Sequence, residues 1–179
     1  TLWHTLSLHD ALPIWGEVVI GRQGIGLGRG VLFGAVDVFA PFSPLEVDRE
    51  WRRGVDAVRA EYRLSNTSSM EVIAAFGESW GDSALLGRIR GYLGNVDGEL
   101  IFGKRGEDSI LGLVASTILF DAEVHVEGAV FKTDEDQPAG GGLGGHDRWV
   151  GKLVAGGSYT FNIGNGLTVE AHFAVGQKD

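Results

Sequence analysis

The feature that most constrains the fold of this chain is a series of segments in which apolar and polar residues alternate. From residue 54 onward, segments of about ten residues are separated by turn signals such as Asn66-Thr67-Ser68 and Asn165-Gly166. Alternation with a period of two places successive side chains on opposite faces of a β-strand. The sequence therefore predicts an all-β, antiparallel fold made of hairpins that follow one another along the chain.

About nine strands are predicted from these segments. The clearest alternation is in residues 122–130, where alanine and valine alternate with Glu123, His125 and Glu127. The segment from Ser109 to Leu119 differs from the others because it is apolar on both faces. The predicted strands lie at residues 17–22, 55–64, 70–76, 85–93, 96–105, 109–119, 122–130, 149–161 and 167–175.

Composition and charge exclude several classes of protein. No run reaches the roughly 18–20 apolar residues that a membrane-spanning helix needs. The net charge of −9 argues against nucleic acid as a partner, because phosphate binding needs a basic face. The chain contains no cysteine, which excludes disulfides and thiolate metal sites. Its 29 glycines beside 4 prolines suit strands that pack closely and turn tightly.

Three features favour a transmembrane β-barrel over a soluble sandwich or barrel, which alternation alone also fits. The polar face of the segments carries charges, whereas the other face is wholly apolar. Connections at 66, 95, 120–121 and 165 are expected to be short, and those at 80, 105–106 and 138 longer and more charged. Aromatic residues on the apolar face lie near strand ends, as in the girdles of outer-membrane barrels. We therefore expect the short turns on the periplasmic side and the 132–146 loop outside.

A long loop at residues 24–53 is also expected to start and end on the outer side, and the residues in and around it resemble a known family. Gly21-Arg22-Gln23, Asp37-Val38-Phe39-Ala40-Pro41, Asp48-Arg49-Glu50 and Gly54-Val55-Asp56-Ala57 are similar to the opening of porin-like bacterial outer-membrane barrels. The chain departs from that pattern at Leu27-Gly28, where Trp-Gly is usual, and at Gly34-Ala35, where Asn-Pro is common. The resemblance covers roughly residues 16–176 and implies an outer-membrane barrel and a passive pore, without a defined substrate.

Charged residues of this loop and of the polar strand faces are candidates for the lining of a pore. Rings of fixed charge select permeant ions in narrow channels. The same charges could instead only hold the loop against the wall, and both interpretations stay open. The candidate lumen and constriction residues are Arg22, Asp37, Asp48, Arg52, Arg59, Glu61, Arg63, Arg88, Arg90, Glu123, His125 and Glu127.

Other motifs do not predict a catalytic, cofactor or metal site. The glycine-rich run at residues 24–30 lacks the spacing of a phosphate-binding loop. Glu123, His125 and Glu127 share one strand face and could bind a metal or act as acid and base, but a lumen-facing charge ladder is favoured. No Ser/His/Asp set can be brought together from the sequence.

The first fourteen residues are expected to be a non-native leader. Residues 5–14 (TLSLHDALPI) resemble a translated short-read sequencing adapter. We therefore divide the chain into this leader, residues 1–14, and a barrel fragment, residues 15–179. Because bacterial single-chain barrels normally have an even number of strands, we expect the fragment alone to form a curved open sheet or a forced small barrel.

The sequence thus predicts a porin-like passive channel of the bacterial outer membrane, with no enzymatic activity. Its expected partners are outer-membrane lipid and small solutes or ions, with no nucleic acid. Two alternatives from other classes stay open: an outer-membrane barrel enzyme of the lipid hydrolase type, and a soluble β-rich binding domain. No oligomeric state is predicted.

Overall fold

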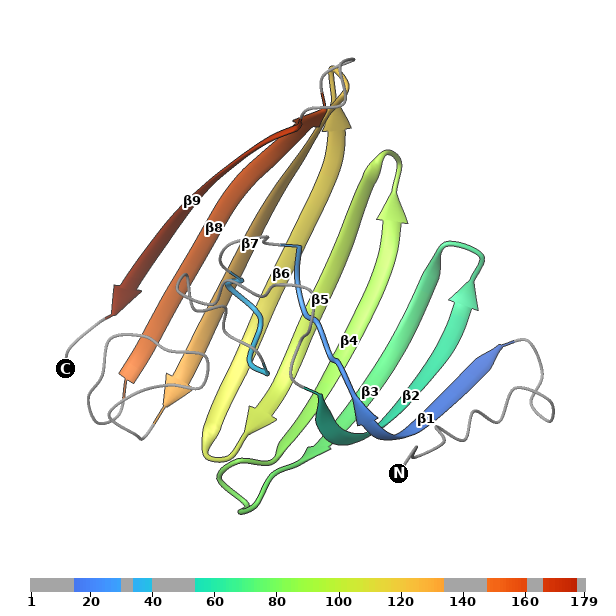
Figure 1. The fold of residues 1–179 in the computed structure, drawn as a ribbon, viewed down its shortest axis with the longest axis vertical. Helices are drawn as coiled ribbons and strands as arrows, with labels where there is room; N and C mark the ends of the chain where they lie inside the picture. The colour runs from blue at the N-terminus through green and yellow to red at the C-terminus, as the bar shows by residue number, and fades with distance from the viewer. Residues whose placement is uncertain (1–14, 30–33, 40–53, 134–147, 161–165, 177–179) are drawn as a thin grey trace.

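The chain folds into one nine-stranded antiparallel sheet in which the strands follow one another in chain order, as the computed structural model shows (Figure 1). The structure describes residues 15–29, 34–39, 54–133, 148–160 and 166–176. The all-β, antiparallel hairpin arrangement expected from the alternation is confirmed. The strands are β1 (Gly16–Gln23), β2 (Val55–Ser65), β3 (Ser68–Phe76), β4 (Ala84–Leu93), β5 (Val96–Arg105), β6 (Asp108–Leu119), β7 (Ala122–Thr133), β8 (Arg148–Thr160) and β9 (Gly166–Gly176).

The connections between strands lie at two opposite edges of the sheet. The turns between β2 and β3, β4 and β5, and β6 and β7 share the upper edge in Figure 1. The last of these uses Phe120 and Asp121, which both have positive φ, as a type I′ hairpin requires. We call the other edge the long-loop edge, because the connections at 24–53 and 134–147 start there.

One predicted connection was wrong. The turn after Arg105 was expected to be long, but only Gly106 and Glu107 separate β5 from β6. Gly106 has a φ of +57°, a conformation that glycine adopts without steric cost. The charged residues around this glycine suggested a longer outer loop, whereas the single glycine is sufficient for a tight turn.

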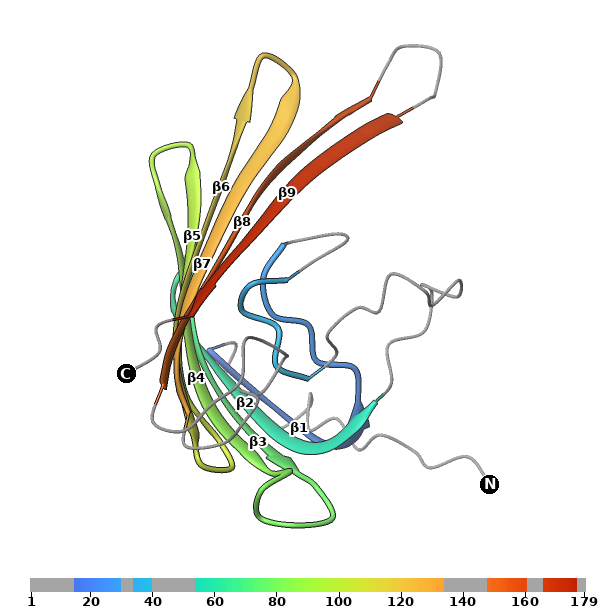
Figure 2. The same cartoon turned by 90° about the vertical axis from the view of Figure 1, so that its left-hand side faces the viewer.

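The sheet is strongly curved and open (Figure 2). Strands β1 and β9 are the two outermost strands of the sheet, and the described residues show no pairing between them. An open curved sheet is one of the two forms expected for the fragment. The curvature gives the sheet a concave face and a convex face, and the strand pleat assigns alternate residues to each.

The concave face is covered by the segment that follows β1. We call residues 24–29 and 34–39 the strap, because they lie across the concave face in both views (Figures 1 and 2). The strap buries Ile25, Leu27 and Val36 in a shared apolar core with the sheet. The sheet contributes side chains from β2 to β8 to this core, among them Ala57, Ile73, Leu86, Ile101, Ile110, Val114, Phe131, Val150 and Val154.

The convex face is exposed and mostly apolar, and its described charged residues lie only near the long-loop edge, whereas the sequence predicted a wholly apolar face. It carries Tyr62, Met70, Val72, Phe76, Leu85, Ile89, Phe102, Leu111, Leu113, Val126, Val130, Trp149, Leu153 and Val169, all exposed. The apolar character of both faces of β6 is explained by this arrangement. Ile110 and Val114 are buried beneath the strap, whereas Leu111 and Leu113 are exposed on the convex side. No helix in the described segments is long and apolar enough to cross a membrane.

Candidate functional site

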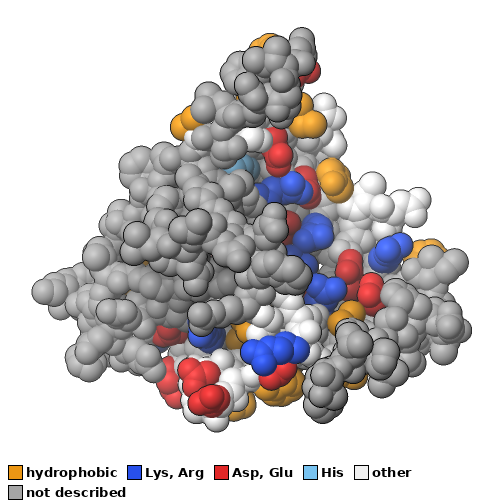
Figure 3. Space-filling model, in the orientation of Figure 1, with side chains coloured by type: hydrophobic (Ala, Val, Ile, Leu, Met, Phe, Trp, Pro, Cys, Tyr) orange, Lys and Arg blue, Asp and Glu red, His pale blue; other side chains and the backbone are white. Residues whose placement is uncertain are grey.

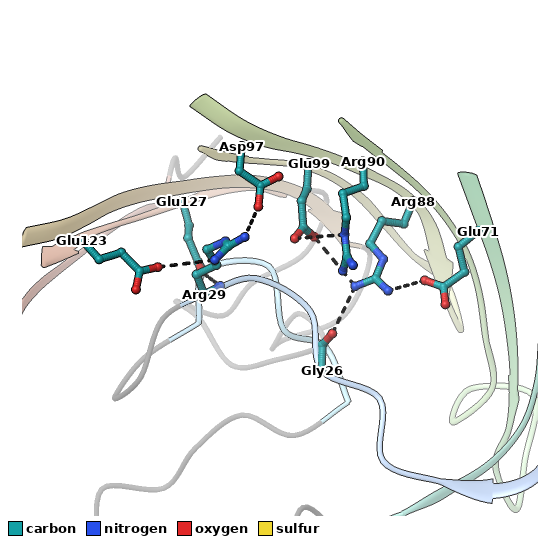
Figure 4. Close-up of polar contacts among 9 residues, drawn as sticks. All are labelled: Gly26, Arg29, Glu71, Arg88, Arg90, Asp97, Glu99, Glu123 and Glu127. Carbon is teal, nitrogen blue, oxygen red and sulfur yellow. Dashed lines mark hydrogen bonds and ion pairs between the residues drawn. The ribbon is translucent and has the colours of Figure 1, made fainter. Parts of the chain in front are cut away.

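A ladder of alternating charges crosses the concave face from β2 to β5. Arg59 Nε lies 3.2 Å from Glu71 Oε1, and Arg88 Nη2 lies 2.5 Å from Glu71 Oε2. Glu99 is 3.8 Å from Arg88 Nη1 and 3.4 Å from Arg90 Nε. Figure 4 shows Glu71, Arg88, Arg90 and Glu99 pointing toward one another from neighbouring strands. The antiparallel register accounts for the ladder, because Glu71 stands opposite Arg88, and Arg90 opposite Glu99.

The carboxylates of this ladder are buried, whereas most of its arginines are not. Glu71 is 4% exposed and Glu99 is 7% exposed. Burying a carboxylate costs several kcal/mol unless cationic partners surround it, and breaking such a pair is strongly destabilising. Each buried carboxylate here has two arginine partners, Arg59 and Arg88 for Glu71 and Arg88 and Arg90 for Glu99. The ladder therefore fixes the positions of its charges on the concave face.

A second polar cluster holds the strap against the sheet. The Arg29 guanidinium pairs with Asp97 of β5 and lies 3.4 Å from Glu123 of β7. The carboxylate of Glu127, which is fully buried, accepts hydrogen bonds from the backbone N–H of Arg29 and from that of Ala35, the latter at 2.9 Å. One carboxylate thus anchors both halves of the strap, and Figure 4 shows its position beside Arg29.

Two arginines of the sheet contribute further contacts to the strap. Arg88 Nη1 donates to the Gly26 carbonyl at 3.4 Å, and the Arg105 guanidinium donates to the Val38 carbonyl. Arg88 therefore joins the charge ladder to the strap. Carboxylates and arginines of the sheet thus form hydrogen bonds with backbone N–H and C=O groups of the strap that would otherwise be buried without partners.

The close approach of the strap to Glu127 depends on Gly28. This glycine has a φ of +79°, and a Cβ atom there would lie 2.6 Å from Glu127 Oε1. Any side chain would be strained by the backbone conformation and would displace the carboxylate. The glycines of this segment, which do not fit a phosphate-binding loop, therefore have a structural role at this position.

An open cleft of about 450 Å³ lies beside Arg29, toward the edge with the β4–β5 and β6–β7 turns. Its charged lining comes from Arg29, Asp97, Asp121 and Glu123, and hydroxyl groups come from Ser116, Thr117 and Ser158. Figure 3, which views the concave face, shows basic and acidic side chains gathered in a band across the visible part of that face. The arrangement presents fixed charges of both signs to an open cleft, which suits an ion or a small polar solute.

Eleven of the twelve predicted lumen residues fall into four groups. Arg59, Arg88, Arg90, Glu123 and Glu127 belong to the two polar clusters just described. Glu61, Arg63 and His125 also occupy concave positions, of which His125 is buried. Asp37 lies in the strap, where it is buried and accepts a hydrogen bond from the Phe39 N–H at 3.1 Å. Asp48 and Arg52 lie outside the described residues, as do residues 1–14, which were predicted to be a leader.

Arg22 is placed apart from the other candidates. The register sets it opposite Asp56, which in turn stands opposite the exposed Phe76 of the convex face. Its Nε donates to the Gly54 carbonyl at 3.2 Å. Arg22 therefore supports the start of β2 and is not part of the concave clusters.

Four residues of the clusters were not among the predicted candidates: Arg29, Glu71, Asp97 and Glu99. The alternation of apolar and polar residues places the three acids on the same face of the sheet as Arg88 and Arg90. This shared face was the signal that could have found them. Arg29 had no such signal, because its position depends on the path of the strap.

No group of three His, Asp or Glu side chains in the described part of the chain could hold a metal ion. Lys152 of β8 is buried on the concave side, with its Nζ 4.8 Å from the centre of the Phe131 ring. This cation–π contact places one further positive charge near the strap.

Neither a protein-family model, nor a curated protein sequence, nor a solved structure matches this chain.

Proposed function

We propose that this chain is part of a bacterial outer-membrane β-barrel that acts as a passive, porin-like channel with the concave face as its lumen. The observation that supports the proposal is the distribution of side chains between the two faces of the sheet. Paired charges and a polar cleft lie on the concave side, and exposed apolar side chains cover the convex side. This is the pattern of transmembrane barrels, in which lipid-facing and lumen-facing residues alternate along each strand.

The convex face is difficult to reconcile with exposure to water. It exposes Phe76, Leu85 and Leu113 by 60%, 60% and 62%. Contiguous apolar patches larger than a few hundred Å² are rare on soluble monomers. In the hydrocarbon core of a bilayer, these apolar side chains would contact lipid and would not be exposed to water. The backbone groups at the outer edges of β1 and β9 would pair with further strands of a closed barrel.

The concave face supports conduction of ions or small polar solutes in preference to catalysis. Its charged groups are engaged in ion pairs that fix them in space, as expected of a selective lining. A strap folded over the same face narrows the space beside it. A lipid hydrolase would need a Ser–His pair facing outward, whereas His125 is buried on the concave side.

Conductance tests the channel proposal directly. The complete barrel that contains this chain, reconstituted into a planar bilayer, should give discrete conductance steps. Glu123→Gln should shift the reversal potential in a salt gradient toward anion selectivity, because it removes a negative charge from the cleft. Glu107→Gln, in an exposed turn, is the matched control. Absence of steps in membranes that contain folded protein would rule out the channel.

Leu113→Arg tests the membrane assignment separately. Leu113 lies on the convex face near the middle of β6, where an arginine in lipid costs about 2–4 kcal/mol. Folding into liposomes, followed by the mobility of unheated samples on gels, should therefore fail or shift to higher lipid content. Glu107→Arg at the turn should fold normally. If Leu113→Arg instead remained folded and dispersed in water without lipid or detergent, the soluble binding domain would be the better description.

A further inference from the structure

Charges on the convex face are confined to one edge of the sheet. Among the described side chains, the convex register positions carry only four: Arg22, Asp56, Lys104 and Lys132. All four lie toward the long-loop edge. The convex positions near the opposite edge carry none.

The two lysines are the unbalanced part of this set. Arg22 stands directly opposite Asp56, so this pair adds no net charge to the face. Lys104 stands between Leu85 and Ser109, and Lys132 between Ser109 and Trp149. Both lysines are exposed, and neither forms an ion pair with any residue that the structure describes.

The register gathers these residues into one short row across four strands. Lys104, Ser109, Lys132 and Trp149 pair in sequence from β5 to β8. Two strand spacings separate the lysines, which corresponds to about 10 Å between their backbones. Trp149, directly beside Lys132, is 55% exposed. A hydroxyl and an amphipathic ring thus accompany the two cations at the border of the apolar face.

We propose that Lys104 and Lys132 form a binding site for the phosphate-bearing headgroup of an anionic lipid at the long-loop edge. This inference rests on the proposed membrane function. A lysine on a lipid-facing surface is costly at the bilayer midplane but costs little near the interface, where its amine reaches the headgroups. Exposed Leu111 and Phe102, which stand opposite each other on the same face, extend the apolar surface below the row for the acyl chains.

The positive charges of Lys104 and Lys132 favour an anionic headgroup over a zwitterionic one. A zwitterionic headgroup offers no net attraction to two ammonium groups, whereas a phosphate monoester carries net negative charge. Trp149 adds the aromatic contact that anchors proteins at headgroup level. The site lies at the long-loop edge. We therefore expect the anionic headgroups to belong to the leaflet on that side of the membrane.

Quenching of tryptophan fluorescence by brominated lipids tests the site. The chain is folded in micelles that contain either brominated phosphatidic acid or brominated phosphatidylcholine, and the Trp149 contribution is taken as the difference from Trp149→Phe. The relative binding constant for phosphatidic acid at Trp149 should exceed that for phosphatidylcholine by roughly 30-fold, since each lysine near an anionic surface contributes roughly 5-fold.

In the Lys104→Gln/Lys132→Gln double variant, the binding constants for phosphatidic acid and phosphatidylcholine should become equal. In each single variant, the preference for phosphatidic acid should lie between those of the parent chain and the double variant. Arg63→Gln, which removes a positive charge from the concave side near the other edge, is the control and should keep the preference. Circular dichroism confirms that each variant retains its strands. Equal quenching by both lipids in the parent chain would overturn the headgroup site alone. Absence of quenching by either lipid would overturn the membrane proposal and this inference with it.

Discussion

The strap is held at its centre by one carboxylate, and Glu127→Gln measures what that carboxylate contributes. Glu127 accepts the N–H groups of Arg29 and Ala35 from a fully buried position. A glutamine has the same size but only one acceptor oxygen, so its amide group turns a donor toward the second N–H. One buried backbone donor is then left without a partner.

The magnitude follows from these two hydrogen bonds. A buried donor without a partner costs about 1–3 kcal/mol. The bond that remains changes from charge-assisted to neutral and weakens by about 1 kcal/mol. Together these effects destabilise the seated strap by about 2–4 kcal/mol, which raises the population of the displaced strap by about 30-fold to 1000-fold.

Cysteine labelling measures this population, because the chain has no cysteine of its own. Val36 belongs to the strap and is fully buried against the sheet, and Val36→Cys substitutes a small apolar group that a thiol reagent reaches only when the strap is displaced. When reclosing is fast relative to labelling, the rate follows the population of the open form. In this background, Glu127→Gln should accelerate labelling, whereas Glu107→Gln in the exposed turn should leave it unchanged. Equal labelling rates in the two variants would refute the anchoring role of Glu127.

Two further substitutions probe the packing and the charges of the concave face. Gly112→Ala should lower the free energy of unfolding in detergent by about 1–3 kcal/mol, because its methyl group would lie 2.6 Å from Val36 Cγ1 and overpack the contact between strap and sheet. Gly128→Ala, with its nearest neighbour 3.8 Å away, should leave the free energy of unfolding unchanged. Arg88→Gln should lower the free energy of unfolding in detergent by about 3–5 kcal/mol, because Glu71 and Glu99 lose a partner while buried. Denaturant titration of the Arg88 variant with a midpoint equal to that of the parent would show that the ladder contributes nothing to stability.

The predicted strands agree with the structure because strand alternation is a local property. The segment 55–64 became β2 (Val55–Ser65), and 109–119 became β6 (Asp108–Leu119). The turn at Asn66 separates the strands where expected, whereas the two-residue turn after Arg105 was misjudged from its charges. The open, curved form also agrees with one of the two expectations.

The candidate site was only partly predictable. Arg88 and Arg90 were identified by parity, but their partners Glu71 and Glu99 depend on the register between strands, which the turn lengths fix. Arg22 was grouped with the lumen residues although the register places it with the convex face.

By itself, the sequence determined the order of the strands and the face to which each side chain belongs, because a period of two and the turn signals act within about ten residues. Only the tertiary structure decided which charges meet and where the strap lies. Arg29 and Glu127 are 98 positions apart, and their contact requires the curvature of the sheet, the register of several strand pairs and the tight fit at Gly28. Such a contact depends on the geometry of many residues along the chain at once, so no short sequence pattern predicts it.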